Sequence, residues 1–137
     1  RFTGFSTEMA ESFPDIRVLH PECSFLDESL SERIAMRAIQ SDSELRGIYL
    51  TSAGREGVYR AVHAAHRSEK LHIVVHDVTE GNIKMVKNGT VDFIIGQDVN
   101  TQGTLPIRLL YDYLERHRFP KERMNMTDIT IKFRGNV

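Results

Sequence analysis

The chain has 137 residues and a mass of 15.7 kDa, with 40% hydrophobic and 27% charged residues, as expected of one globular domain with a continuous core. Its net charge of -1 offers no basic footprint for nucleic acid or an anionic membrane. The single cysteine, Cys23, excludes an internal disulfide and a four-thiolate zinc site, and it favours a reducing compartment. No apolar run approaches the roughly 18 to 20 residues of a membrane-spanning helix.

An amphipathic pattern of large apolar residues, including Phe2, Phe5 and Phe13, predicts a helix at the start of the chain. The pattern begins directly after Arg1, without an initiator methionine or a capping residue. We therefore expect the chain to start inside a helix of a longer protein. No linker or internal repeat follows, so residues 1–137 are expected to form one unit.

The chain then alternates between short β-rich runs and helical patterns. A first strand is predicted at Ile16–Leu19, and a helix is predicted from about Asp27, whose side chain can cap it. Further strands, separated by helices, are predicted at Gly47–Leu50, Leu71–Val75 and Val91–Ile95. This alternation is typical of an α/β domain with a mainly parallel sheet and helices on both faces.

The last third of the chain continues the alternation. A short helix is predicted at about Gly81–Lys87 and the longest one at about Thr101–Arg118, where Pro106 marks either a kink or the true first turn. A strand is predicted at Ile129–Phe133. The long helix carries an apolar stripe formed by Leu109, Leu110 and Leu114.

Polar residues follow three successive predicted strands, and in a parallel sheet these strand ends meet at one edge, where ligands bind. The residues are Thr51 and Ser52, His76 and Asp77, and Gln97 and Asp98. Carboxylate, amide and hydroxyl groups together suit a neutral polyhydroxylated ligand, because they accept hydrogen bonds from its hydroxyl groups and donate hydrogen bonds to them. The alternative is that the two aspartates only cap the following helices or form turns.

Three motifs, in this order and spacing, resemble the sugar-sensing domain of the lactose-repressor (LacI) family of transcription regulators. The motifs are Arg1-Phe2-Thr3-Gly4-Phe5, Val74-Val75-His76-Asp77-Val78-Thr79, and the segment from Asn88 to Gly103. The resemblance covers essentially the whole chain and corresponds to the C-terminal half of a type I periplasmic-binding-protein fold, which periplasmic sugar-binding proteins share. It implies a lobe of a two-lobed domain whose first lobe and helix-turn-helix headpiece are absent from this chain.

The resemblance also implies roles for individual residues. Arg1 falls on an arginine that contacts sugar hydroxyls, Asp77 on an acidic ligand contact, and Gln97 on a glutamine at the crossover between lobes. Where the family typically has Asn-Asp, this sequence has Thr51-Ser52, which leaves the identity of the sugar open.

An aromatic ring often stacks on the sugar in that family, and Phe25 is the candidate for this role here. No cofactor is implied. A metal site at His63 and His66 lacks a third ligand.

As a LacI-type regulator the protein would be cytoplasmic, not an enzyme and not membrane-bound. It would bind a small sugar effector, form a homodimer, and contact DNA only through the absent headpiece, with the sugar shifting the balance between DNA-binding states. The alternative is a periplasmic sugar-binding protein that serves a transporter. An enzyme acting on a sugar, with Asp77 and Asp98 as a carboxylate pair, is the weaker alternative.

Overall fold

The computed structural model describes residues 1–68 and 70–137, which form a four-stranded sheet with helices. The elements in chain order are α1 (Phe2–Ser12), α2 (Glu28–Ser41), β1 (Gly47–Leu50), α3 (Arg55–Ala64), β2 (His72–His76), α4 (Glu80–Lys87), β3 (Phe93–Gln97), α5 (Val99–Arg116) and β4 (Ile129–Lys132). The strand order is β1-β2-β3-β4; the first three strands are parallel, and β4 pairs antiparallel with β3. The predicted α/β class with a mainly parallel sheet is confirmed.

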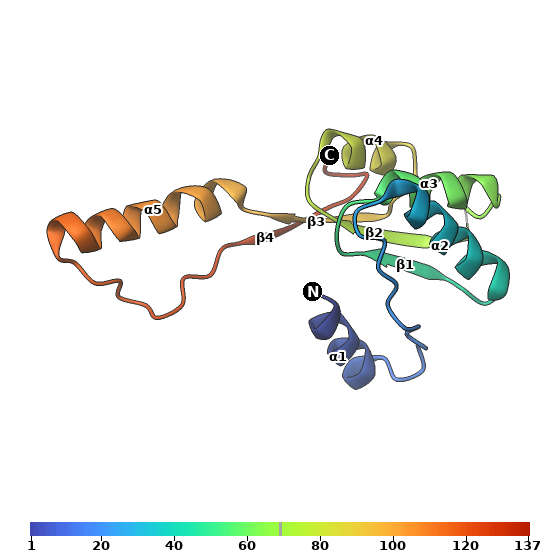
Figure 1. Cartoon of the computed structure of the whole chain (residues 1–137), viewed down its shortest axis with the longest axis horizontal. Coiled ribbons are helices and arrows are strands. Elements are labelled where there is room, and N and C mark those ends of the chain that lie inside the picture. The colour runs from blue at the N-terminus through green and yellow to red at the C-terminus, as the bar shows by residue number, and fades with distance from the viewer. Residues whose placement is uncertain (69) are drawn as a thin grey trace.

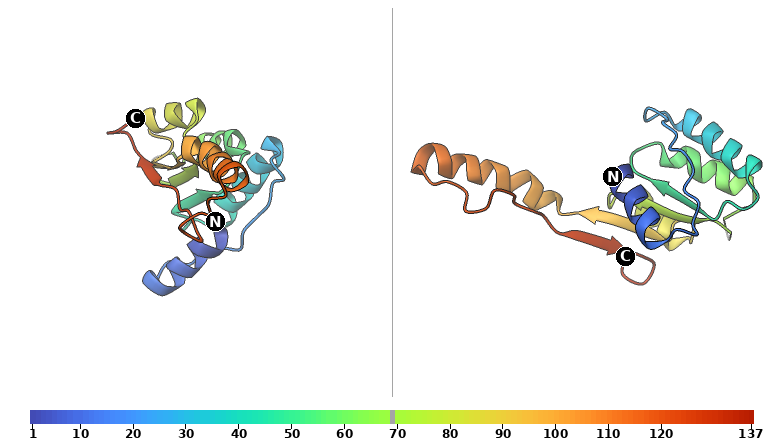
Figure 2. Two further views of the ribbon diagram at one scale, coloured as in Figure 1. Left: turned by 90° about the vertical axis from the view of Figure 1, so that its left-hand side faces the viewer. Right: turned by 90° about the horizontal axis from the view of Figure 1, so that it is seen from below.

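The helices lie on both faces of the sheet but cover them unequally. Helices α2, α3 and α4 lie on one face, as expected when parallel strands follow one another in one direction through crossovers of the same hand (Figure 1). Helix α1 lies on the opposite side (Figures 1 and 2). None of its residues is buried, so this second face is only thinly covered.

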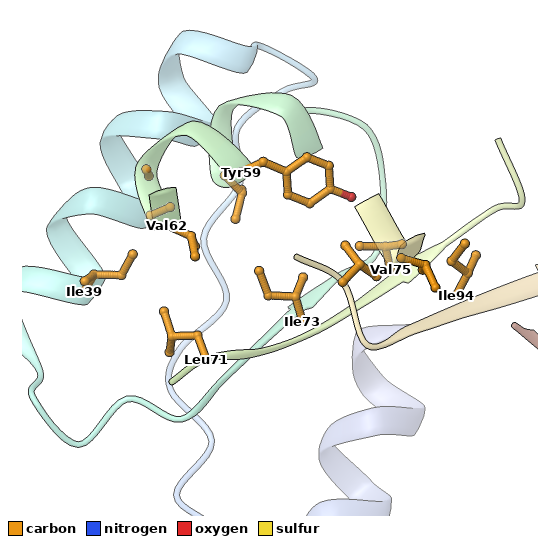
Figure 3. Close-up of a cluster of buried hydrophobic side chains, with 12 residues drawn as sticks. Ile39, Tyr59, Val62, Leu71, Ile73, Val75 and Ile94 are labelled. Carbon is orange, nitrogen blue, oxygen red and sulfur yellow. The ribbon is translucent and has the colours of Figure 1, made fainter. Parts of the chain in front are cut away.

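The core lies between the sheet and the three helices on its covered face (Figure 3). Alternate residues of β2, Ile73 and Val75, are 0% and 1% exposed and point into this layer, where they meet Val62 of α3 and Ile94 of β3. Helices α2 and α3 pack so closely that a Cβ on Gly57 would lie 1.9 Å from the carbonyl oxygen of Glu28. Only glycine permits this approach.

The predicted helix cap at Asp27 is confirmed, because its Oδ1 accepts a hydrogen bond of 2.7 Å from the backbone N–H of Leu30. Two predicted strands are displaced along the chain, since β2 and β3 end one and two residues later than expected. Before β3, the N–H groups of Thr90 and Val91 both donate to the carbonyl of Met85, which keeps this segment attached to the end of α4.

The predicted strand at Ile16–Leu19 is wrong. This segment forms no ladder with the described strands, and β1 pairs only with β2. The N–H of Ile16 donates instead to the carbonyl of Phe13, and the side chain of Ile16 is 55% exposed. A β-rich run forms a strand only where its backbone groups hydrogen-bond to a neighbouring strand, and the sequence of the run does not show whether such a neighbour exists.

Helix α5 and the segment after it form an arm that extends away from the sheet before β4 returns to pair with β3 (Figures 1 and 2). The helix runs without interruption through Pro106, and none of its residues is buried. Leu110 and Leu114 are 57% and 58% exposed, while Leu109 is half-buried. The described residues therefore leave most of the predicted apolar stripe uncovered. No helix in the described part of the chain is long and apolar enough to cross a membrane.

Candidate ligand-binding site

The parallel strands β1, β2 and β3 end at Leu50, His76 and Gln97, and these ends share one edge of the sheet. The following helices α3, α4 and α5 begin a few residues later, so their N-termini also lie at this edge. Gly54 caps α3 with a φ of 90°, a left-handed conformation that glycine adopts without strain. Short polar loops thus meet helix N-termini at the carboxyl edge of the sheet, which is where open α/β sheets bind ligands.

Asp77 occupies the centre of this edge in a left-handed conformation with a φ of 72°. The fully buried side chain of Asn82 holds this turn: its Nδ2 donates to the carbonyl oxygens of His76 and Asp77 at 3.0 Å and 2.7 Å. The hydroxyl of Tyr59 donates in turn to Oδ1 of Asn82 at 3.2 Å. The amide in the core therefore stabilises the backbone conformation that places the Asp77 carboxylate at the edge.

The structure separates the two aspartates for which capping was the alternative explanation. Thr79, not Asp77, caps α4, because its hydroxyl oxygen accepts from the N–H of Asn82 at 3.2 Å. Asp98 does cap α5, accepting from the N–H of Thr101 at 3.0 Å, and these hydrogen bonds lower the pKa of Asp98. Asp98 therefore caps a helix, whereas Asp77 lies in a turn without capping a helix.

Three side chains converge on one another although they come from distant parts of the sequence. Nε2 of Gln97 donates to Oδ1 of Asp77 at 2.8 Å, and the guanidinium of Arg1 lies 3.7 Å from the same oxygen. Arg1 also donates to the carbonyl oxygen of Thr51 at the end of β1. The side chains of Arg1 and Asp77 are 37% and 44% exposed, so they remain accessible to a ligand.

Gln102 adds an amide that the sequence analysis quoted only as part of a motif. Its Nε2 donates to Oε1 of Gln97 at 3.4 Å and to the hydroxyl of Thr127 at 3.1 Å. Gln102 therefore connects the first turn of α5 and the segment before β4 to Gln97 and, through it, to Asp77. Its position one helical turn after the Asp98 cap is the sequence signal that could have identified it.

The remaining predicted residues have looser positions. Thr51 is half-buried and contributes its carbonyl to Arg1, while Ser52 is exposed in the bend that follows. Phe25 is 81% exposed with a φ of 51°, and no described contact joins its ring to Asp77. Its loop does lie at the same edge, because Oγ of the neighbouring Ser24 would be 3.2 Å from a Cβ on Gly54.

A second group lies beside these residues; His76 was expected at this edge, but its contact with Tyr49 and Phe5 was not predicted. The hydroxyl of Tyr49 on β1 and Nε2 of His76 on β2 are 2.7 Å apart, and the ring of Phe5 on α1 lies over Tyr49 with centroids 4.6 Å apart. Burial raises the pKa of Tyr49, and the charge of Arg1 opposes this shift. Burial also lowers the pKa of His76, and the charge of Arg1 lowers it further.

The arrangement is suited to binding hydroxyl groups. The carboxylate of Asp77 accepts hydrogen bonds, the guanidinium of Arg1 donates them, and the amides of Gln97 and Gln102 do both. Within residues 1–68 and 70–137, no group of three or more His, Cys, Asp or Glu residues could hold a metal ion. The fold and this edge together define one lobe of an α/β ligand-binding protein.

Comparison with known families agrees with this class. The family described as "Periplasmic binding protein domain" matches residues 1–118, and the chain therefore belongs to that family. No curated protein sequence matches the chain significantly. The family match establishes the type I periplasmic-binding-protein fold that the resemblance implied, but it does not extend to the LacI regulators in particular.

Solved structures share the fold over nearly the whole chain. The sugar-binding protein of a sugar ABC transporter from Bacillus halodurans is 25% identical with a TM-score of 0.85, and the match covers 98% of this chain and 50% of that one. GanP, a glucose-galactose binding protein from Geobacillus stearothermophilus, is 18% identical with a TM-score of 0.88, and the match covers 99% and 48%. An ABC transporter solute binding protein from Agrobacterium vitis with bound D-fucose is 19% identical with a TM-score of 0.86, and the match covers 99% and 46%. The chain thus spans about half the length of these proteins.

Proposed function

We propose that the chain is one lobe of a sugar-binding protein and that its site for sugar hydroxyls is the Asp77 cluster, composed of Arg1, Thr51, Asp77 and Gln97. The observation that carries the proposal is the position of Asp77. Its carboxylate is not used to cap the following helix; instead it is exposed at the strand edge, beside the amide of Gln97 and the guanidinium of Arg1. Ser52 and Phe25 would supply adaptable contacts from the loops beside the cluster.

The Asp77 cluster lies at an exposed edge of the sheet, so we propose that a second lobe covers this edge and completes the sugar site. The solved relatives are about twice as long as this chain, which leaves room for such a lobe in the whole protein. The sugar would bind between the lobes and favour their closed arrangement. The sugar would be bound without chemical change, because the residues of the Asp77 cluster act by donating and accepting hydrogen bonds.

We favour the role of a receptor that delivers sugar to a transporter. Several of the similar solved structures are sugar- or solute-binding proteins of ABC transporters. The second candidate is a LacI-type regulator, a cytoplasmic homodimer whose sugar controls DNA binding through a separate headpiece. The segment His76-Asp77-Val78-Thr79 favours this candidate, because it resembles regulators more than transport proteins.

The test is calorimetric titration of the full-length protein with a panel of D-glucose, D-galactose, D-xylose, L-arabinose and D-ribose. At least one sugar should bind, and Asp77→Asn should weaken that binding, while Asp15→Asn, at an exposed position, should not. If none of the sugars binds, or if Asp77→Asn binds as tightly as the wild type, the proposal is overturned. Sugar-dependent release of DNA from the full-length protein would favour the regulator, and sugar-dependent binding to a transporter would favour the receptor.

A further inference from the structure

The position of Arg1 depends on a chain of contacts that begins inside the sheet. Arg1 stands at the N-cap of α1, and the N–H of Phe5, one turn later, donates to the carbonyl of Arg1 at 3.1 Å. The ring of Phe5 packs on Tyr49 at 4.6 Å between centroids. The first turn of α1 is thus attached to the sheet by this aromatic contact and by Arg1 itself, which donates to the carbonyl of Thr51 and lies 3.7 Å from Oδ1 of Asp77.

Tyr49 is itself held by His76. The hydroxyl of Tyr49 and Nε2 of His76 are 2.7 Å apart, and their rings lie 5.5 Å apart between centroids. His76 is 9% exposed, and its Nδ1 is buried without a hydrogen-bond partner among the described residues. A buried imidazole with one satisfied nitrogen has a strong preference for the neutral form, in which Nε2 can accept the hydroxyl proton of Tyr49.

Charged groups near His76 come from two elements. Arg1 approaches from the start of α1, and Asp77 directly follows His76 after the end of β2. Three further described partners of His76 are uncharged: Tyr49 on β1, Asn82 on α4, and Ile95, which pairs with His76 on β3. Burial and the positive charge of Arg1 lower the pKa of His76, whereas the carboxylate of Asp77 raises it.

We propose that Tyr49 and His76 form a pH-sensitive positioning pair for Arg1. With His76 neutral, the pair holds Tyr49 under Phe5, and Phe5 keeps the guanidinium of Arg1 beside the carboxylate of Asp77. With His76 protonated, Nε2–H donates to the hydroxyl of Tyr49 instead of accepting from it, and a second cation competes with Arg1 for the carboxylate of Asp77. Acidification therefore weakens sugar binding. This inference rests on the proposed function of the Asp77 cluster.

The lowered pKa of His76 determines how sugar affinity should change with pH. Since the pKa of His76 lies below its usual value of 6.5, the imidazole is neutral at neutral pH, and sugar affinity should be constant there. As the pH falls below this value, the imidazole of His76 becomes protonated in the unfolded chain, and in molecules whose Tyr49–His76 contact is broken, before it becomes protonated in the intact pair. Both stability and sugar affinity should therefore decline on the acidic side.

The test measures the affinity of the full-length protein, between about pH 7.5 and about pH 5, for the best-binding sugar of the panel. Wild-type affinity should fall by roughly threefold or more over this range. His76→Gln, which keeps a hydrogen-bonding side chain and cannot take up a proton here, should remove most of the decline. His63→Gln, on the exposed side of α3, should retain it. A decline that persists unchanged in His76→Gln would overturn the proposal.

Tyr49→Phe provides a second variant that preserves the ring under Phe5 and removes only the hydroxyl. It should weaken sugar binding at about pH 7.5 several-fold, and it should also lower the melting temperature, because Nε2 of His76 loses its described partner. A purely structural role for Tyr49 would lower the melting temperature and leave the affinity unchanged, which would count against the pair.

An NMR measurement without sugar separates this inference from the proposed function. In the sugar-free full-length protein, the side-chain N–H signal of Arg1 should shift with the same midpoint as the His76 imidazole. Arg1→Gln should raise the pKa of His76, because it removes a neighbouring positive charge. If both effects occur and no sugar binds, the pair stands and the sugar assignment fails. If a sugar binds but the Arg1 and His76 signals titrate independently, the pair is wrong.

Discussion

The side-chain amide of Gln97, the last residue of β3, donates a 2.8 Å hydrogen bond to the carboxylate of Asp77, the residue that follows β2. This bond fixes the orientation of both groups at the strand edge before a ligand arrives. Oδ1 of Asp77 already accepts from Gln97 and faces Arg1, so Oδ2 is the oxygen that no described contact occupies. We expect it to accept a sugar hydroxyl.

Loss of Asp77 and loss of Gln97 should both weaken sugar binding, but by different amounts. Asp77→Ala should cost about 2 kcal/mol or more, since a charged acceptor is lost, and Gln97→Ala should cost about 1 kcal/mol. The two effects should not add in the double variant, because the residues share one hydrogen bond. Calorimetric titration of the full-length protein measures all four affinities. Strict additivity would show that the two side chains act independently.

Asn82→Ala should destabilise the protein by about 1 to 3 kcal/mol, because it leaves two carbonyl oxygens and the hydroxyl of Tyr59 without their described partner. The variant should also weaken sugar binding, since the left-handed turn of Asp77 loses its support. Denaturant unfolding and calorimetry measure the two effects separately. Asn88→Ala, in the turn after α4, serves as the control and should leave sugar affinity unchanged.

The cap at Asp98 predicts a pH dependence of stability. Hydrogen bonds from Thr101 lower the pKa of Asp98, so its contribution is present above the unfolded-state pKa of about 3.9 and is lost as the pH falls through the lower folded-state value. Asp98→Asn keeps a capping side chain and removes the charge, so its stability should vary less with pH in this range. Urea unfolding at several acidic pH values tests this. Equal slopes for the wild type and the variant would contradict it.

The uncovered stripe on α5 should cause the isolated chain of 137 residues to associate with itself. Ile107, Leu110 and Leu114 are 70%, 57% and 58% exposed and share one side of the helix, and an apolar surface of this kind promotes association. Sedimentation velocity should detect dimers or larger species that decrease in Leu110→Ser/Leu114→Ser. Ile16→Ser, at another exposed apolar position, should have no such effect.

The α/β class, most of the strands, and the polar residues at the strand ends could be predicted from the amino-acid sequence alone. These features are local: apolar runs of β-branched residues form buried strands, and Asp27 caps a helix through its own side chain wherever that helix lies. The convergence of Asp77 and Gln97 also followed, because parallel strands necessarily end at the same edge.

Which β-rich run becomes a strand, and which aspartate stays accessible, depends on contacts between distant parts of the chain. Ile16–Leu19 has the composition of a strand but lacks a partner, and pairing is a property of the neighbouring chain. Asp77 and Asp98 look equivalent in sequence, yet Thr79 caps one helix and Asp98 the other. The contact of Tyr49 with His76 likewise depends on the register between β1 and β2, because distant residues interact only after the sheet has brought them together.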